Sequence, residues 1–160
     1  MKLQNELLKD LLKKDSNGGV SKWRKTTGSS DYFNLGITDG YIIKFYNSKH
    51  FFVNLDCDYI QPDSVNAAPL LDAIRRDGQQ AVLTNNRIQY NDGKNTAAII
   101  ETADGKKTAV NIDYFKYFES KYLTMQDFQF ITCGQRAPIA LVYNDTIHGI
   151  ILPVKIAGLN

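Results

Sequence analysis

The chain has 160 residues, of which 43% are hydrophobic and 22% are charged, and its formal net charge at pH 7 is +2. A chain of this length buries about two thirds of its surface on folding, which is enough for one hydrophobic core and too little for two ordinary domains. The composition excludes the disordered, collagen-like and disulfide-scaffold classes, and the small net charge excludes nucleic-acid binding through bulk positive charge.

The first part of the chain, residues 1–56, predicts one helix followed by three strands. Residues 3–12 carry leucines on one half of a helical wheel, and Lys2, Lys9 and Lys13 gather on the opposite side. The segments 32–38, 41–46 and 50–55 are rich in aromatic and β-branched residues and are separated by short turns, which indicates antiparallel strands. A connector at 57–78 contains a short helix at 70–76.

The second part, residues 79–160, repeats strands and a helix. We expect strands at 81–83, 87–90 and 97–102, then a helix over 112–123 that begins at Asn111, an N-cap residue. Three further strands follow, at 128–132, 139–143 and 148–154. The sequence therefore predicts a single α+β domain over residues 1–160, built from two helix-plus-three-strand halves whose helices pack on an antiparallel sheet.

Three segments resemble the bacterial DNA sliding clamp, the processivity ring of the replicative polymerase. Residues 36–41, Gly-Ile-Thr-Asp-Gly-Tyr, are similar to a strand and turn of that family. Residues 110–118, Val-Asn-Ile-Asp-Tyr-Phe-Lys-Tyr-Phe, are similar to the start of one of its helices. Residues 137–139 and 151–156, Ala-Pro-Ile and Ile-Leu-Pro-Val-Lys-Ile, resemble its closing strands.

This resemblance implies a DNA-clamp-like fold that engages double-stranded DNA and the peptides of polymerases and repair proteins. The helices would face DNA through lysines on their polar sides, namely Lys2, Lys9, Lys13, Lys116 and Lys121. The peptide pocket would use the positions that match the family pattern, namely Gly40, Tyr41, Leu152, Pro153 and Val154.

Two departures from the family limit the analogy. A bacterial clamp has three such domains in each chain whereas this chain has room for one, so a ring would require several copies and we expect a homo-oligomer. Ile42 also follows Tyr41 where the family usually carries arginine. Ordinary solvation of the lysines and ordinary core packing of the pocket residues are the alternative explanations.

Catalytic and metal motifs are absent from the sequence, so we expect no enzyme, no metal and no cofactor. His50 and His148 lack metal-ligand spacing, and Cys57 and Cys133 are expected to be buried free thiols of a cytoplasmic protein without a membrane span. Two functions remain. The first is a self-associating clamp-like protein that binds DNA or replication proteins; the alternative is an adaptor or decoy that binds proteins and does not encircle DNA.

Overall fold

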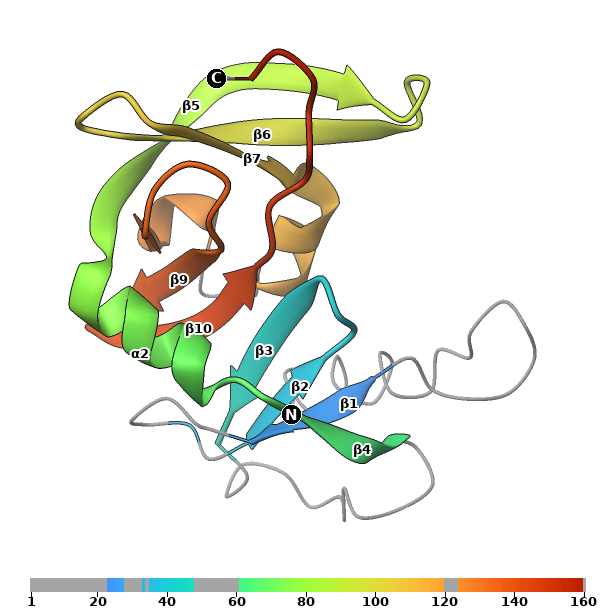
Figure 1. The fold of residues 1–160 in the computed structure, drawn as a ribbon, viewed down its shortest axis with the longest axis vertical. Helices are drawn as coiled ribbons and strands as arrows, with labels where there is room; N and C mark the ends of the chain where they lie inside the picture. The colour runs from blue at the N-terminus through green and yellow to red at the C-terminus, as the bar shows by residue number, and fades with distance from the viewer. Residues whose placement is uncertain (1–22, 28–32, 34, 48–60, 120–123, 160) are drawn as a thin grey trace.

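The strands form a single sheet in the computed structural model, which describes residues 23–27, 33, 35–47, 61–119 and 124–159. They are hydrogen-bonded in the order β4-β1-β2-β3-β10-β9-β8-β5-β6-β7, and the sheet curves strongly from one end to the other (Figure 1). β1 and β4 run parallel, and the other neighbouring strands run antiparallel. The bounds are β1 (Arg24–Thr27), β2 (Leu35–Thr38), β3 (Ile42–Tyr46), β4 (Gln61–Asn66), β5 (Gln79–Tyr90), β6 (Asn95–Thr102), β7 (Lys107–Asn111), β8 (Gln129–Thr132), β9 (Ile139–Tyr143) and β10 (Thr146–Ile151).

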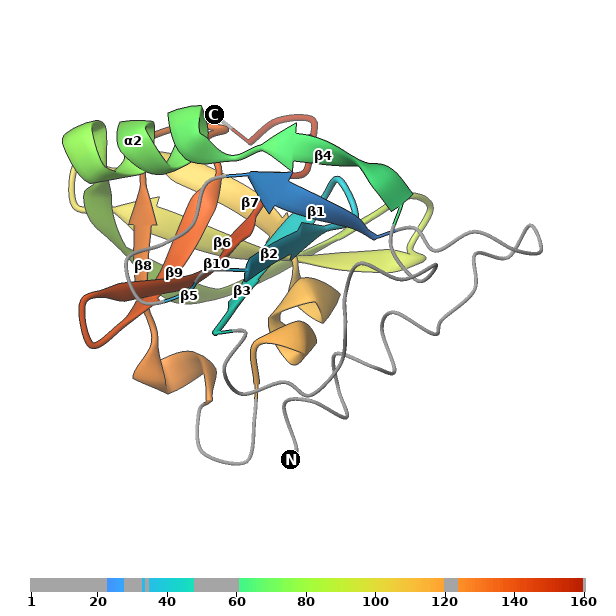
Figure 2. The same ribbon diagram turned by 90° about the horizontal axis from the view of Figure 1, so that it is seen from below.

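Helices pack on opposite sides of this sheet. The α-helix α2 (Ala68–Asp77) covers one side, and the 3-10 helices η2 (Ile112–Tyr117) and η3 (Met125–Asp127) lie on the other (Figure 2). α2 has Pro69 in its first turn, where the fixed φ of proline suits a helix, and it buries Leu71 and Ile74. In the part of the chain that the structure describes, no helix is long and apolar enough to cross a membrane.

The main hydrophobic core lies on the side of the sheet that faces η2. Successive strand residues point to opposite faces, so Ala98 and Ile100 of β6 enter this core whereas Ala97 and Ile99 point away from it. The outward pair is covered by the C-terminal residues 154–159, and a further cluster lies under α2. The main core consists of Trp23, Ile37, Ile42, Tyr46, Ala81, Ala98, Ile100, Val110, Phe115, Phe118, Phe128, Phe130, Ile139, Leu141 and Ile151.

The predicted fold class is wrong. The described strands belong to one mixed sheet, in which β10 from the end of the chain pairs with β3 and the connector supplies the edge strand β4. The expected second helix over 112–123 is a six-residue 3-10 helix instead. In a 3-10 helix, residues three apart lie on the same side, and this spacing sends both Phe115 and Phe118 into the core. The clamp-like arrangement of two helix-plus-strand halves is therefore not the architecture of this chain.

Several individual elements agree with the sequence. The helix expected at 70–76 is confirmed as α2, and the strands expected at 128–132 and 139–143 are confirmed as β8 and β9. The segments expected at 81–83 and 87–90 are one long strand, β5, whose pairing with β6 is irregular between Leu83 and Arg87. The expected first helix and the strand at 50–55 lie outside the described residues.

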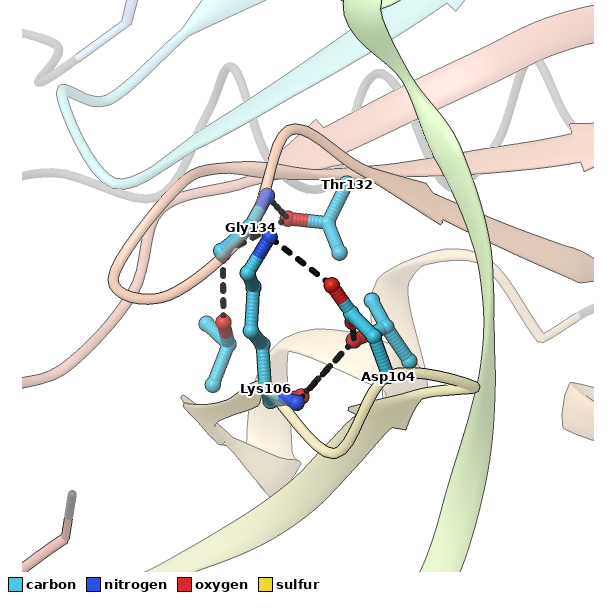
Figure 3. Close-up of polar contacts among 6 residues, drawn as sticks. Asp104, Lys106, Thr132 and Gly134 are labelled. Carbon is cyan, nitrogen blue, oxygen red and sulfur yellow. Dashed lines mark hydrogen bonds and ion pairs between the residues drawn. The ribbon is translucent and has the colours of Figure 1, made fainter.

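A polar cluster joins the β6–β7 turn to the loop after β8 (Figure 3). The Asp104 carboxylate accepts a hydrogen bond from the Thr102 hydroxyl and pairs with Lys106 Nζ at 2.8 Å. The Thr108 hydroxyl, from β7, donates to the carbonyl oxygen of Gly134 at 3.0 Å. The hydrogen bonds from Lys106 and Thr102 lower the pKa of Asp104 to about 2. The bond from Thr108 to Gly134 links β7 to the loop after β8.

Candidate functional site

The turn between β2 and β3 holds Tyr41 in a fixed, outward position. Thr38 Oγ1 accepts a hydrogen bond from Gly40 N at 3.0 Å and donates one to the carbonyl oxygen of Ile42 at 2.7 Å. Asp39 Oδ1 accepts hydrogen bonds from Tyr41 N at 2.9 Å and Ile42 N at 3.0 Å. Gly40 has a φ of 92°, a conformation that glycine adopts without strain. The side chain of Tyr41 is 60% exposed on this braced turn.

Tyr41 stacks on Tyr114 of η2. Their ring centroids are 6.3 Å apart, and their planes differ by 19°. Asn111 caps η2 as the sequence predicts, because its side chain accepts a hydrogen bond from Asp113 N at 2.9 Å. On the opposite side, Phe115 is 1% exposed and anchors η2 in the main core. Each ring of the stacked pair is therefore held by a fixed backbone.

Asp39 and Tyr90 lie close enough to Tyr114 to affect its ionisation. Burial first, and the negative charge of Asp39 next, raise the pKa of Tyr114 to about 12. Burial also raises the pKa of Tyr90, against a hydrogen bond with Asn111 that lowers it. Tyr114 and Tyr90 are consequently neutral phenols over the physiological pH range. We call Tyr41, Tyr90 and Tyr114, together with the carboxylates of Asp39 and Asp113, the tyrosine surface.

The C-terminal segment runs beside the tyrosine surface. Leu152 N donates a hydrogen bond to the carbonyl oxygen of Tyr41 at 2.8 Å, and Val154 N donates one to that of Ala109 at 2.8 Å. The structure thus brings Gly40 and Tyr41 next to Leu152, with Pro153 between the two anchored residues. The side chain of Val154 packs instead on the outward face of β6 and β7. The peptide-binding role of these five residues stays a prediction.

One of the lysines expected to face DNA lies within the described residues. Lys116 is exposed on η2, and its Nζ is 2.6 Å from Asp113 Oδ1, which raises the pKa of the lysine. This ion pair cancels much of the positive field that a phosphate would meet at this point. Lys2, Lys9, Lys13 and Lys121 lie outside the described residues. DNA binding therefore stays a prediction as well.

Sequence reasoning missed a buried cation next to the tyrosine surface. Lys44 of β3 is 4% exposed, and its Nζ lies 4.3 Å from the ring centroid of Tyr117 and 5.6 Å from that of Trp23. Alternation along the strand could have found it, because Lys44 shares a face with Ile42 and Tyr46, which are both in the main core.

The stacking of Tyr114 on Tyr41 was also missed. Periodicity places Tyr114 beside Phe115 on an apolar face, and Tyr114 does pack, partly buried, against the main core. Nothing local in the sequence indicates that its ring meets that of Tyr41. Only the pairing of β2 with β3, and the packing of η2 against the core, bring the two rings together.

His148 occupies an aromatic environment rather than a metal site. It lies at the bulge of β10, with ring centroids 4.9 Å from Phe33, 5.8 Å from Phe128 and 5.8 Å from Tyr143. Burial lowers the pKa of His148, and a hydrogen bond to the backbone of Tyr143 opposes this. No group of three His, Cys, Asp or Glu residues within the described ranges could hold a metal ion.

The two cysteines differ from expectation in one respect. Cys133 is an exposed free thiol, not a buried one, and Cys57 falls outside the described ranges. The exposure follows from the position of Cys133 at the end of β8, where the chain leaves the sheet.

Comparisons with known proteins give no relative for this chain. No family model matches it, and neither a curated protein nor a solved structure matches it. Its function must therefore be argued from the tyrosine surface itself.

Proposed function

We propose that the protein is a non-enzymatic interaction module that binds a partner protein through the tyrosine surface. The observation that carries this proposal is the 60% exposed ring of Tyr41, which a hydrogen-bonded turn holds against Tyr114. The role corresponds to the adaptor alternative of the sequence analysis and needs neither a metal nor a cofactor.

Tyrosine suits such a role for physical reasons. Its ring offers a large contact area at a low cost in conformational entropy, since it has two rotatable side-chain bonds, and its hydroxyl can bond to a partner. Binding energy at protein interfaces is concentrated in a few side chains, among which tyrosine is enriched. The stacking on Tyr114 restricts the Tyr41 ring before binding, which further reduces the ordering cost.

Other exposed apolar residues of the described chain lack this support. Val82, on β5, is 61% exposed, but scattered surface valines are ordinary and need no functional explanation. Tyr41 differs because it combines exposure with a braced backbone and an aromatic neighbour. Val82 is therefore a control residue that is as exposed as Tyr41 but has no proposed binding role.

Self-association, DNA binding and a cytoplasmic location are further predictions about this protein. Self-association stays a prediction from the length of the chain. DNA binding concerns lysines that lie mainly outside the described ranges, and the Lys116–Asp113 pair does not favour DNA on η2. The free, exposed Cys133 is compatible with a reducing compartment, and on that ground we infer a cytoplasmic location.

A selection experiment tests the proposed function. A random peptide library displayed on phage would be selected on the full chain, and the best peptides would be mapped by NMR on isotope-labelled protein. We expect the largest amide shift changes at residues 38–42, in η2 and at Leu152. Tyr41→Ala should weaken peptide binding at least tenfold, whereas Val82→Ala should leave it unchanged.

Two results would overturn the proposal. One is a set of selected peptides that bind Tyr41→Ala as tightly as wild type. The other is a chain that yields no binding peptide yet binds a DNA duplex in low salt, measured by fluorescence anisotropy, which would favour the DNA-binding hypothesis instead.

A further inference from the structure

We propose that residues 152–159 form a strap that holds the turn of Tyr41 next to the helix of Tyr114, so that the tyrosine surface binds its partner tightly only while the strap is docked. This inference rests on the proposed function and names the regulation of the same site. Its support comes from two backbone hydrogen bonds, from the places of β3 and β7 in the sheet and from an apolar cluster.

The strap joins two elements that are far apart in the sheet. Tyr41 lies in the turn before β3, and Tyr114 lies in η2, which directly follows β7. Five strands separate β3 from β7 in the hydrogen-bonded order. Leu152 N nevertheless donates to the carbonyl oxygen of Tyr41 at 2.8 Å, and two residues later Val154 N donates to that of Ala109, in β7, at 2.8 Å. The strap therefore ties together the backbones of the two elements that carry the stacked rings.

The strap is docked on an apolar face formed by β5, β6 and β7 (Figure 1). Val154 and Ile156 are partly buried there whereas Lys155 between them is exposed, which is the alternation of an extended segment that lies on a sheet. The buried residues of this face are at most 2% exposed, namely Ala97, Ile99 and Ala109. Undocking would expose them to water, so the docked form is the stable one.

Tyr90 connects the strap to the tyrosine surface by a second route. It packs against the same apolar cluster as Val154 and Ile156. Its side chain is also hydrogen-bonded with Asn111, the residue that caps η2. A strap that leaves the cluster therefore removes packing beside a side chain that bonds with the cap of the Tyr114 helix.

The strap is held more weakly than the strand from which it leaves. Its residues lie outside the regular strands, and its apolar side chains are partly buried. Ile150 and Ile151, at the end of β10, are 0% exposed. Segments with few buried contacts open at a lower free energy than the core does. The strap can consequently open while the sheet stays folded.

Substitutions at two neighbouring residues test the strap in the full chain. Ile156→Asp places a carboxylate against the apolar face, whereas Ala157→Asp adds the same charge at an exposed position. NMR would follow hydrogen exchange of the Val154 amide and the nuclear Overhauser signal between the rings of Tyr41 and Tyr114. We expect Ile156→Asp to speed the exchange by about tenfold or more and to weaken the ring signal. Ala157→Asp should change neither.

Two results of this experiment overturn the inference. One is faster exchange at Val154 beside an unchanged ring signal, and the other is an unchanged exchange rate in Ile156→Asp. The signals of the core residue Phe115 report whether the fold is intact. If they change in Ile156→Asp, Ile156→Ala takes its place, with smaller effects expected in the same direction.

Partner binding provides the reciprocal test. If docking of the strap favours binding, then binding must favour docking by the same factor. A peptide selected on the tyrosine surface should bind Ile156→Asp about threefold or more weakly than wild type, and at saturation it should slow Val154 exchange in wild type by a similar factor. Equal affinity for the two forms, or an unchanged exchange rate on binding, overturns the inference.

The inference and the proposed function fail in different ways. Peptides that lose binding in Tyr41→Ala but bind Ile156→Asp like wild type would overturn regulation by the strap and leave the interaction module intact. Peptides that bind Tyr41→Ala unchanged would overturn the module, and the measurements at Val154 and the two rings would still decide whether the strap positions them, because they need no ligand.

Discussion

Two tyrosines of η2, three residues apart, have different neighbours. Tyr117 contacts Trp23, with ring centroids 6.4 Å apart, and the buried Lys44, whose Nζ is 4.3 Å from its ring centroid. Tyr114 stacks on Tyr41, which is 60% exposed. Both rings are partly buried and pack against the main core, so their neighbours and not their burial distinguish them. Tyr117 helps to enclose a buried cation, whereas Tyr114 supports the exposed ring of Tyr41, which a partner can reach.

The largest loss of stability is expected when the buried cation, Lys44, is removed. Lys44→Ala removes a buried side chain and its contacts with two aromatic rings, and we expect the free energy of unfolding to fall by about 2 to 4 kcal/mol. Chemical denaturation measures it. As the matched control, Lys116→Ala on the exposed side of η2 should change stability by less than about 0.5 kcal/mol. Equal effects of the two substitutions would contradict the contrast between the two sides.

The next effect concerns the packing of η2 on β10. A Cβ at Gly149 would overlap the ring of Phe118, so Gly149→Ala should destabilise the fold by about 1 to 3 kcal/mol. The cost should shrink but not vanish in a Phe118→Ala background, because the overlapping ring is then absent while the added Cβ still lies 2.7 Å from the carbonyl oxygen of Ile43. A double-mutant cycle by thermal unfolding checks this, and a fully additive result would show that the overlap is relieved elsewhere.

A smaller, pH-dependent effect comes from His148. Burial lowers its pKa from 6.5 in the folded state, so the unfolded chain binds a proton before the folded chain does. Stability is then highest above pH 6.5 and falls as the pH drops from 6.5 towards the lowered pKa of the folded state. His148→Phe should remove this part of the pH dependence. The prediction would be contradicted if the wild-type protein became more stable between pH 7 and pH 5 while the His148→Phe variant did not.

Tyr114 makes the stability of the fold depend on pH in the alkaline range. The pKa of Tyr114 is raised from 10.0 to about 12 by burial first and by Asp39 next, so folding favours its neutral form. Its contribution is present below pH 10.0 and is lost as the pH rises from 10.0 to about 12. Tyr114→Phe should remove one phenol that ionises near pH 12 from an ultraviolet absorbance titration. An unchanged titration curve would show that Tyr114 is not the residue in that environment.

Only a small effect on stability is expected at Tyr41. Tyr41→Ala removes a mostly exposed ring and should lower the free energy of unfolding by no more than about 1 kcal/mol, although it removes the stacking on Tyr114. Chemical denaturation checks this. A large loss would mean that Tyr41 serves the fold and is not reserved for a partner.

The sequence predicted local features of the fold and failed on their assembly. The Asn111 cap, the helix now seen as α2 and the Thr-Asp-Gly turn all depend on neighbouring residues and were recognisable. The pairing of β10 with β3 joins residues about a hundred positions apart, and no local pattern encodes it. The helix expected over 112–123 is a 3-10 helix over Ile112–Tyr117, and the apolar pattern could not tell the two apart, because Phe115 and Phe118, three residues apart, share a face in either kind of helix.

The candidate site was predictable to a similar degree. Gly40, Tyr41 and Leu152 were named from a resemblance whose implied fold is wrong, and the structure nevertheless brings them together through the bond between Leu152 N and the Tyr41 carbonyl. Tyr114 completes the surface from another element, so its part depends on tertiary packing that periodicity cannot indicate.

The most direct test of the account is the affinity of one selected peptide for three forms of the full chain, measured by fluorescence anisotropy at physiological salt. We predict that Tyr41→Ala raises the dissociation constant at least tenfold while Val82→Ala, which removes an equally exposed side chain, matches wild type. Equal dissociation constants for Tyr41→Ala and wild type would contradict the claim that Tyr41 is held outward to bind a partner.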